Sequence, residues 1–203
     1  MTTADPEISV GFTVPRTEAE GPGWRFALWV QGCPFRCAGC CNPELLSFTP
    51  RVAAPVMRAS ALAAECLSHD VEGVSLLGGE PFAQAAGLAA LARAVKSAGR
   101  SVMVFTGYTL DEIRAMESPA AAELLSLTDL LVDGRYEASL RTTARRWVGS
   151  ENQVMHFLTD RYSPLDARFH EGNSVEIRMT RGGEITLNGW PVDGALTRIG
   201  RPR

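Results

Sequence analysis

Features that mark several other classes of protein are missing from this sequence, and the first is an excess of charge of one sign. The 203 residues carry 20 Lys and Arg against 23 Asp and Glu, which gives a net charge of -3. No basic stripe that could neutralise a phosphate backbone runs along the chain. We therefore expect no nucleic-acid partner.

Long hydrophobic runs are also missing. No apolar run approaches the length that spans a bilayer, and the polar, acidic residues 1–22 lack the apolar core of a signal peptide. We therefore expect no membrane partner and a cytoplasmic location. Thiols stay reduced in that compartment, so the five cysteines indicate metal ligands or reactive groups rather than disulfides.

Common catalytic patterns are missing as well. The sequence has no Ser/His/Asp pattern, no Walker loop and no pair of carboxylates at a clear spacing. His156 falls in an apolar strand and His170 in a polar loop, so neither is a convincing catalytic base.

The hydrophobic content, 45% of the residues, suits a single α/β domain with a sizeable core. We expect residues 1–22 to form a polar, mobile leader, residues 23–160 to form the core, and residues 161–203 to be a C-terminal extension of the same domain. No internal repeat or low-complexity tract argues for a second domain.

Strands and helices alternate from residue 25 to residue 132. Strands are predicted over 25–31, 73–77, 101–105 and 129–134, with helices over 54–69, 83–97, 109–116 and 119–127 between them. Thr109 and Glu112 have the spacing of a capping box. This alternation predicts a parallel sheet with crossover helices. The last third differs, with a strand over 152–158 and a hairpin over 174–190 that turns at 181–183.

Active sites of parallel α/β proteins form beyond the carboxyl ends of the strands. Four loops follow predicted strands here, and we expect them to gather on one face: GCPFRCAGCCNPE at 32–44, GGEPF at 78–82, TGYT at 106–109 and DGRYE at 133–137.

The first of these loops holds four of the five cysteines. Cys33, Cys37 and Cys40 have the spacing C-x3-C-x2-C, and three thiolates leave one iron of a 4Fe-4S cluster open to another ligand. Cys41 is adjacent to Cys40 and is expected to point elsewhere, as a packed thiol that does not bind the cluster.

A zinc site is the alternative for these cysteines. Cys37 and Cys40 could combine with the Cys66 and His69 pair to supply four ligands, which would make the protein a non-catalytic metal-stabilised module. The zinc hypothesis leaves Cys33 and the glycine-rich loops without a role. The simpler interpretation is that Cys66 is a core cysteine and His69 an imidazole at a helix C-terminus.

The cysteine loop followed by LLGGEP resembles the radical S-adenosylmethionine (SAM) enzymes. The ordered segments EGPGWRFALWVQGCPFRCAGCCNPE, FTGYTLDE, LLVDGRYE and GSENQ resemble more closely the glycyl-radical-enzyme activases, in particular those that activate anaerobic ribonucleoside-triphosphate reductase. The resemblance implies a partial (βα) barrel that carries a 4Fe-4S cluster and SAM, with Cys33, Cys37 and Cys40 as the metal ligands.

The resemblance also implies the reaction. Reductive cleavage of SAM at the cluster gives a 5'-deoxyadenosyl radical, which abstracts a hydrogen atom and so installs a glycyl radical on a partner such as anaerobic ribonucleotide reductase. The electron would come from a one-electron donor such as flavodoxin or ferredoxin. No catalytic residue is implied beyond the cluster and SAM.

The resemblance also implies further cofactor-binding residues, at the positions of this sequence that match the family's motifs. The resemblance implies cofactor binding by the glycine strip Gly78, Gly79, Glu80 and Pro81, by Thr106 and Gly107, and by Asp133, Arg135, Ser150 and Asn152. The sequence departs from the closest activases in having Arg135 where some relatives have lysine, and in continuing past the element GSENQ into the predicted hairpin. That extension keeps open a radical SAM enzyme that acts directly on a peptide or a small molecule.

Overall fold

The centre of the fold is a mixed sheet whose middle strands are parallel. The computed structural model describes residues 5–50, 54–179, 181–183 and 185–190. In this part of the chain the large sheet has seven strands in the order β3-β1-β2-β4-β5-β6-β7. Neighbouring strands among the middle four run parallel, namely β2 (Arg25–Val30), β4 (Gly73–Gly78), β5 (Ser101–Phe105) and β6 (Leu130–Asp133).

Antiparallel strands complete both edges of the sheet. β1 (Glu7–Thr17) pairs with β2, β3 (Val56–Arg58) pairs with β1, and β7 (Val154–Phe157) pairs with β6. β3 and β7 are the end strands of the order, so the sheet stays open. The expected α/β class, with a sheet that is at most a partial barrel, is therefore confirmed.

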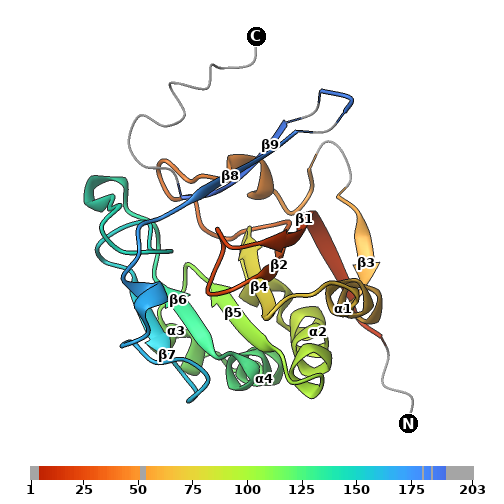
Figure 1. Ribbon diagram of the computed structural model, residues 1–203. Helices are drawn as coiled ribbons and strands as arrows, with labels where there is room; N and C mark the ends of the chain where they lie inside the picture. Colours follow the sequence, from red (N-terminus) through yellow and green to blue (C-terminus); the bar gives the residue numbers. More distant parts are fainter. Residues whose placement is uncertain (1–4, 51–53, 180, 184, 191–203) are drawn as a thin grey trace.

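The helices cover one face of this sheet, below the strands in Figure 1. They are α1 (Ala59–Ser68), α2 (Ala85–Ser97), α3 (Leu110–Arg114) and α4 (Pro119–Leu127). Thr109 caps α3 by the predicted capping box with Glu112. None of the described helices has the length and apolar character needed to cross a membrane.

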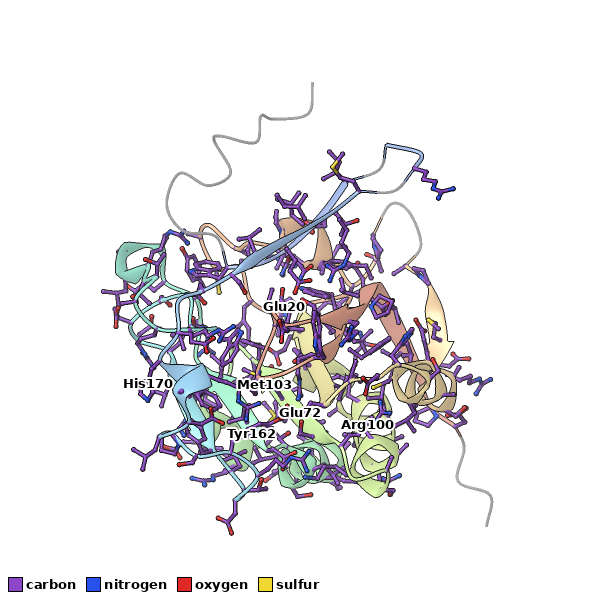
Figure 2. The ribbon with its side chains drawn as sticks, in the orientation of Figure 1. Glu20, Glu72, Arg100, Met103, Tyr162 and His170 are labelled. Carbon is purple, nitrogen blue, oxygen red and sulfur yellow. The ribbon has the colours of Figure 1, made fainter. Side chains whose placement is uncertain are left out.

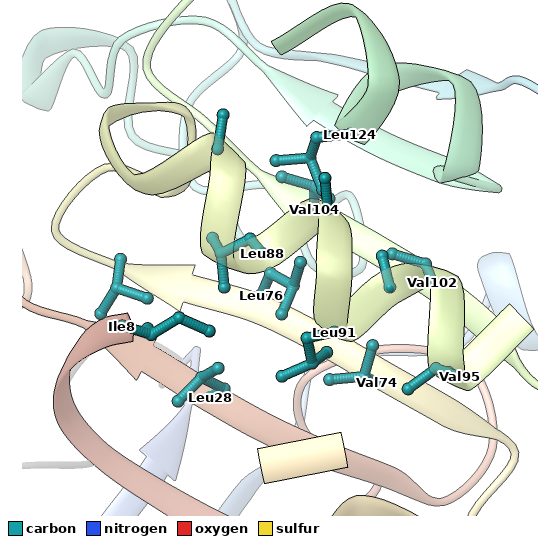
Figure 3. Packing of buried hydrophobic residues seen from close by; sticks show 14 of the residues in the cluster. Ile8, Leu28, Val74, Leu76, Leu88, Leu91, Val95, Val102, Val104 and Leu124 are labelled. Atoms are coloured by element: carbon teal, nitrogen blue, oxygen red, sulfur yellow. The ribbon is translucent and has the colours of Figure 1, made fainter. Parts of the chain in front are cut away.

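Side chains alternate between the two faces of the parallel strands. Leu28, Val74, Leu76, Val102 and Val104 point toward α2 and α4 and belong to the largest hydrophobic cluster, as Figure 3 shows. Their neighbours in sequence point to the opposite face and form two smaller clusters, with Trp29 and Leu77 in one and Met103, Leu130 and Val132 in the other. The face without helices is therefore also lined by apolar side chains.

A separate hairpin lies over that second face. It consists of β8 (Val175–Met179) and β9 (Ile185–Gly189), joined by a turn that includes residues 181–183. The C-terminal hairpin expected from the sequence is thus confirmed, and Figure 1 shows it across the open side of the sheet.

Two sequence expectations were wrong. Residues 7–17, expected in a mobile leader, form β1, where Ile8, Val10 and Val14 are buried. Residues 56–58, expected at the start of a helix, form β3 against β1. The two errors have different causes. Apolar residues alternate in β1 from Ile8 to Val14, which is a strand pattern that the expectation of a leader overlooked, whereas β3 has only three residues and is defined by its pairing with β1.

The amino ends of the parallel strands are closed by a buried guanidinium. Arg25 at the start of β2 is fully buried, and its fork donates hydrogen bonds to the Ser75 and Ser101 hydroxyls, the Tyr162 hydroxyl and the Val74 carbonyl. Burial lowers the pKa of Arg25. Five donors in a fixed plane can meet acceptors from β4, from β5 and from Tyr162 in a loop at once, which an ammonium cannot do.

We expect Arg25→Lys to lower the free energy of unfolding by about 3 kcal/mol, because a buried charge would lose most of its acceptors. Urea denaturation followed by circular dichroism measures the change. Arg161, an exposed residue whose guanidinium donates to the Gly99 carbonyl, supplies the matched control, and Arg161→Lys should change stability by less than about 0.5 kcal/mol. Equal effects of the two substitutions would refute the role given to Arg25.

Candidate metal and cofactor site

The cysteine loop begins where β2 ends. Gly32 (φ 93°) and Gly39 (φ 74°) adopt the left-handed region, and Pro34 follows Cys33, so the loop forms neither helix nor strand. The Gly32 and Cys33 amides donate to the Leu45 and Leu46 carbonyls, which ties the start of the loop to its end. The loop therefore keeps its thiols at the carboxyl end of β2.

A cavity of about 670 Å³ opens beside this loop, on the sheet face opposite the helices. Cys33, Cys37, Cys40 and Cys41 all line it. Its floor consists of apolar side chains from four neighbouring strands, namely Trp29, Leu77, Phe105 and Val132. Val175, Leu187 and Asn188 of the hairpin line its other side.

The glycine strip after β4 touches the start of the cysteine loop backbone to backbone. A Cβ on Gly79 would lie 2.2 Å from the Gly32 carbonyl oxygen, and one on Gly78 would lie 2.4 Å from the Val30 amide nitrogen. Gly78 also has a φ of 107°, which disfavours any residue with a side chain. Gly78 and Gly79 both line the cavity, so their backbone is open to a ligand beside the thiols.

Glu80 joins the loops that follow β4 and β5. Its carboxylate is buried and accepts hydrogen bonds from the Thr106 hydroxyl (2.8 Å), the Gly107 amide (2.8 Å) and the Phe82 amide (2.9 Å). Burial raises the pKa of Glu80 to about 7 despite these donors. Because both carboxylate oxygens are occupied within the protein, the side chain holds the two loops together and is not free to bind a ligand.

The thiols differ in acidity. Burial raises the pKa of Cys33 to about 11. A hydrogen bond between the adjacent thiols lowers the pKa of Cys40 and raises that of Cys41, so Cys40 is favoured as the thiolate and Cys41 as the donor. The expectation that Cys41 does not bind the cluster stays a prediction.

The four-ligand zinc set is not brought together. Cys66 is fully buried in α1, close to Arg25 at the amino end of β2, whereas the cysteine loop follows the carboxyl end of the same strand. Within the ranges that the structure describes, no three His, Cys, Asp or Glu side chains converge on a single ion.

The donor set fits a cluster better than a single ion. A single-ion site needs ligand atoms that meet at one point. A 4Fe-4S cluster is several atoms across and takes one thiolate on each iron, so its ligands need only surround a space. Three thiols from one loop, beside a cavity with an exposed glycine backbone, meet that requirement.

Four of the expected cofactor-binding residues lie away from this cavity. Asp133, Arg135 and Asn152 line a neighbouring cavity of about 660 Å³, and Ser150 is fully buried. Gly134, between Asp133 and Arg135, lines both cavities. The expected residues Thr106 and Gly107 do line the main cavity, whereas Pro81 is buried at the start of a short 3-10 helix.

The polar groups of these four residues are engaged in the protein. Asp133 accepts from the Leu110 amide at 2.6 Å, and its Oδ2 lies 2.9 Å from His156 Nε2 without hydrogen-bond alignment. Arg135 pairs with Glu112 at 3.1 Å and lies over the Phe35 ring. Asn152 donates to the Arg135 carbonyl, and Ser150 accepts from the Glu137 amide. They brace the loop after β6.

Several cavity residues were not found from the sequence. Glu20, Tyr136, Asn188 and Trp190 line the cavity and come from segments up to 170 residues apart. Tyr136 packs against Gly39 and Trp190, and thereby joins the cysteine loop to the end of the hairpin. Glu20 opens the segment EGPGWR and Tyr136 lies in the loop DGRYE, but no spacing in the sequence places them with the hairpin residues, because only the folded chain brings these segments together.

Comparison with known proteins gives a consistent result. Residues 19–156 match the family described as "4Fe-4S single cluster domain". The chain is 34% identical over 145 residues to the anaerobic ribonucleoside-triphosphate reductase-activating protein of Salmonella typhi, which covers 68% of this chain and 91% of the relative. The protein of the same name from Escherichia coli K12 is 32% identical over 148 residues, with the same coverage.

Among solved structures, QueE from Escherichia coli aligns with a TM-score of 0.43 and 15% identity, over 61% of this chain and 68% of that one. The region matched by the family model ends at residue 156, so β8 and β9 lie outside it.

The role of Glu80 can be tested by substitution. We expect Glu80→Ala to lower the free energy of unfolding by about 3 kcal/mol and to speed amide exchange at Gly107 and Phe82, because it leaves their buried donors unpaired. Glu80→Gln should cost less, since one side-chain oxygen remains as an acceptor. Glu123→Ala, which removes only an exposed ion pair with Arg93, should cost less than about 1 kcal/mol. Unchanged exchange at Gly107 in Glu80→Ala would contradict the proposed bracing.

Proposed function

Since the chain belongs to the 4Fe-4S single cluster domain family and to the anaerobic ribonucleoside-triphosphate reductase-activating proteins, we propose that it installs a glycyl radical on a partner ribonucleotide reductase. The observation that carries the proposal is the meeting of three cysteine thiols with two glycine-rich loops around one apolar cavity. When bound there, a 4Fe-4S cluster and SAM supply one-electron cleavage of SAM and abstraction of a hydrogen atom from the substrate.

We assign Cys33, Cys37 and Cys40 to the cluster. Their loop encloses a space rather than a point, and these three thiols have the spacing C-x3-C-x2-C beside the cavity. The three ligands leave one iron for SAM. Gly78 and Gly79 line the same cavity as the thiols, and we propose their backbone groups as contacts for the amino acid part of SAM.

The other strand-end loops position and shield the cofactor. Thr106 and Gly107 form the next part of the cavity wall and are held there by Glu80. The floor of Trp29, Leu77, Phe105 and Val132 excludes water from the region where a reactive radical must persist. Pro81 ends the glycine strip. Asp133, Arg135, Ser150 and Asn152 act indirectly in this proposal, by fixing the loop that contains Gly134.

An electron must enter from a protein donor, and we propose a flavodoxin or a ferredoxin. Cys37 and Cys40 are only partly buried, and the residues between them, Ala38 and Gly39, are exposed. This side of the cysteine loop therefore lets a donor approach the cluster without crossing the cavity.

A second function is favoured by one observation. The hairpin β8–β9, which lies outside the region matched by the family model, lines the cavity through Val175 and Leu187. A covered cavity of this kind also suits a radical SAM enzyme that modifies a peptide or a small molecule directly.

The ligand assignment predicts which cysteine substitutions abolish activity. After anaerobic reconstitution with iron and sulfide, alanine at Cys33, Cys37 or Cys40 should reduce SAM cleavage by at least about a thousandfold, because the cluster loses a ligand. Cys41→Ser, which keeps a hydrogen-bond donor, should retain the cluster. Iron content, the electron paramagnetic resonance (EPR) spectrum with and without SAM, and 5'-deoxyadenosine yield are the measurements. Loss of the cluster in Cys41→Ser would overturn the assignment.

The partner is tested with the reconstituted wild-type protein. Incubation with SAM, a reductant and an anaerobic ribonucleotide reductase should yield the EPR doublet of a glycyl radical on the reductase. Formation of 5'-deoxyadenosine coupled to a modified small molecule, with no radical on the reductase, would favour the second function.

A further inference from the structure

The backbone does not tie the middle of the cysteine loop to its neighbours. Within the described part of the chain, the backbone–backbone hydrogen bonds of residues 34–41 stay inside the loop, where the Cys40 amide donates to the Cys37 carbonyl at 3.2 Å. The Arg36 guanidinium likewise donates to two carbonyls of the same loop. Side-chain contacts must therefore fix this segment, which contains two of the three assigned ligands, against the rest of the protein.

Phe35 makes such a contact with the loop that follows β5. A Cβ on Gly107 would lie 2.6 Å from an atom of the Phe35 ring, so the ring lies directly against the Cα of this glycine. The Tyr108 ring meets the Phe35 ring edge to face, with centroids 4.7 Å apart, which is an arrangement that aromatic pairs prefer. The contact at Gly39 is looser, because a Cβ there would lie 3.5 Å from the Tyr136 ring. Phe35 is therefore the tighter of these two attachments of the loop.

Arg135 covers the other part of the same ring. Its Cζ lies 4.4 Å from the Phe35 centroid, where a guanidinium is attracted by the face of an aromatic ring. Glu112 holds the guanidinium there, with both carboxylate oxygens 3.1 Å from Arg135 Nη1. Glu112 is itself fixed, because it accepts from the Thr109 amide in the capping box of α3. Arg135 thereby connects Phe35 to the loop after β6.

With these contacts, each of three loops around the cavity is joined to the other two. The glycine strip contacts the cysteine loop at Gly32, and Glu80 of the strip binds Thr106 and Gly107 of the loop after β5. Phe35 joins that third loop back to the cysteine loop and also lines the cavity. Loss of its ring would remove one of the three connections and leave every thiol in place.

We propose that Phe35 is a positioning residue for the cluster, whose ring fixes the segment between Cys33 and Cys37 before the cluster binds. The inference rests on the proposed function, because it takes the three assigned cysteines as ligands. Phe35 lies two residues from Cys33 and two from Cys37, so its place limits where both thiols can be. Without the ring, the loop would lose its conformational freedom only on binding, and the cluster would be held less tightly. Arg135 acts through Phe35.

The contacts of the ring are tested first in the metal-free protein. We expect Phe35→Ala to raise the rates of Cys37 and Cys40 alkylation by iodoacetamide, and of amide exchange over residues 35–40, at least about fivefold, because the loop opens more often. Phe35→Tyr keeps the ring and should stay at the wild-type rates. Unchanged alkylation and exchange in Phe35→Ala would refute the proposal.

Phe157 on β7 supplies the matched control. It is also partly buried, and it pairs with Leu130, the first residue of β6, so it lies at the amino ends of the parallel strands. Its ring meets Phe169, which packs against Tyr162, and Figure 2 shows Tyr162 beside Glu72 in this region. Phe157→Ala should lower the stability of the protein without changing thiol alkylation. Equal alkylation rates in Phe157→Ala and Phe35→Ala would give Phe35 a general structural role and overturn the proposal.

The reconstituted protein provides the second test. Phe35→Ala should still take up iron and sulfide, since all three thiols remain, but should lose iron to a chelator at least about tenfold faster than the wild type or Phe35→Tyr. The change that SAM causes in the EPR spectrum should be weaker in Phe35→Ala. Absence of a cluster in the wild type would overturn the proposed function and this inference together. A wild type that cleaves SAM, with Phe35→Ala equal to it in iron release and EPR, would overturn the inference alone.

The role of Arg135 is tested by combining substitutions. Arg135→Ala should speed iron release less than Phe35→Ala does, and the double variant should match Phe35→Ala, because Arg135 acts through the ring. Arg114→Ala, which removes an exposed ion pair with Asp111, is the control and should leave iron release unchanged. Effects of Arg135→Ala and Phe35→Ala that multiply in the double variant would refute the action of Arg135 through Phe35.

Discussion

Close backbone contact between Gly79 and Gly32 is the constraint on which the candidate site depends. The parallel register pairs Val30 with Gly78, so the cysteine loop and the glycine strip leave the sheet side by side. A side chain at Gly79 would separate the loops, because its Cβ would meet the Gly32 backbone at 2.2 Å, and a Cβ on Gly32 would meet the Phe48 ring at 2.4 Å. Because these residues are glycines, backbone atoms without side chains line the cavity beside three thiols. Glu80 holds the loop after β5 against the glycine strip by accepting hydrogen bonds from Thr106 and Gly107.

The parallel strands are closely packed at their amino ends and open to a cavity at their carboxyl ends. At the amino end, Arg25 fills the space between strands and bonds to hydroxyls and carbonyls that would otherwise lie buried without partners. At the carboxyl end, glycines and an apolar floor leave a cavity open. Period-two alternation makes both possible, because the residues that face the cavity side of β2 are Arg25, Ala27 and Trp29, while Phe26 and Leu28 pack against the helices. Hydrogen bonding of Arg25 at the amino ends thus holds the strands together while their carboxyl ends leave a cavity open.

Sequence patterns predicted the parts of the fold that rest on local signals. The parallel strands are short apolar runs, α3 begins at a capping box, and the hairpin carries a glycine turn, so each was found. β1 was missed although its apolar residues alternate from Ile8 to Val14, and β3 was missed because it is a three-residue edge strand that is defined by its pairing with β1. In the site, the cysteine loop and the glycine strip were located because adjacent parallel strands must end together. Asp133, Arg135 and Asn152 were expected in the same cavity, but the loop after β6 turns them to its far side, and of this loop Gly134 and Tyr136 line both cavities.

Glu20 shows most clearly what a linear pattern cannot reveal. Its partners, Asn188 and Gly189, lie nearly 170 residues away, and although Glu20 opens the segment EGPGWR, no spacing in the sequence relates it to the hairpin. Folding places it where the N-terminal segment passes under the hairpin, with one oxygen used to hold the hairpin and the other facing the cavity. A single carboxylate thereby ties the hairpin to the wall of the cavity that the thiols line. Segments before and after the parallel strands therefore complete the wall of a cavity whose thiols and glycines come from the loops that follow those strands.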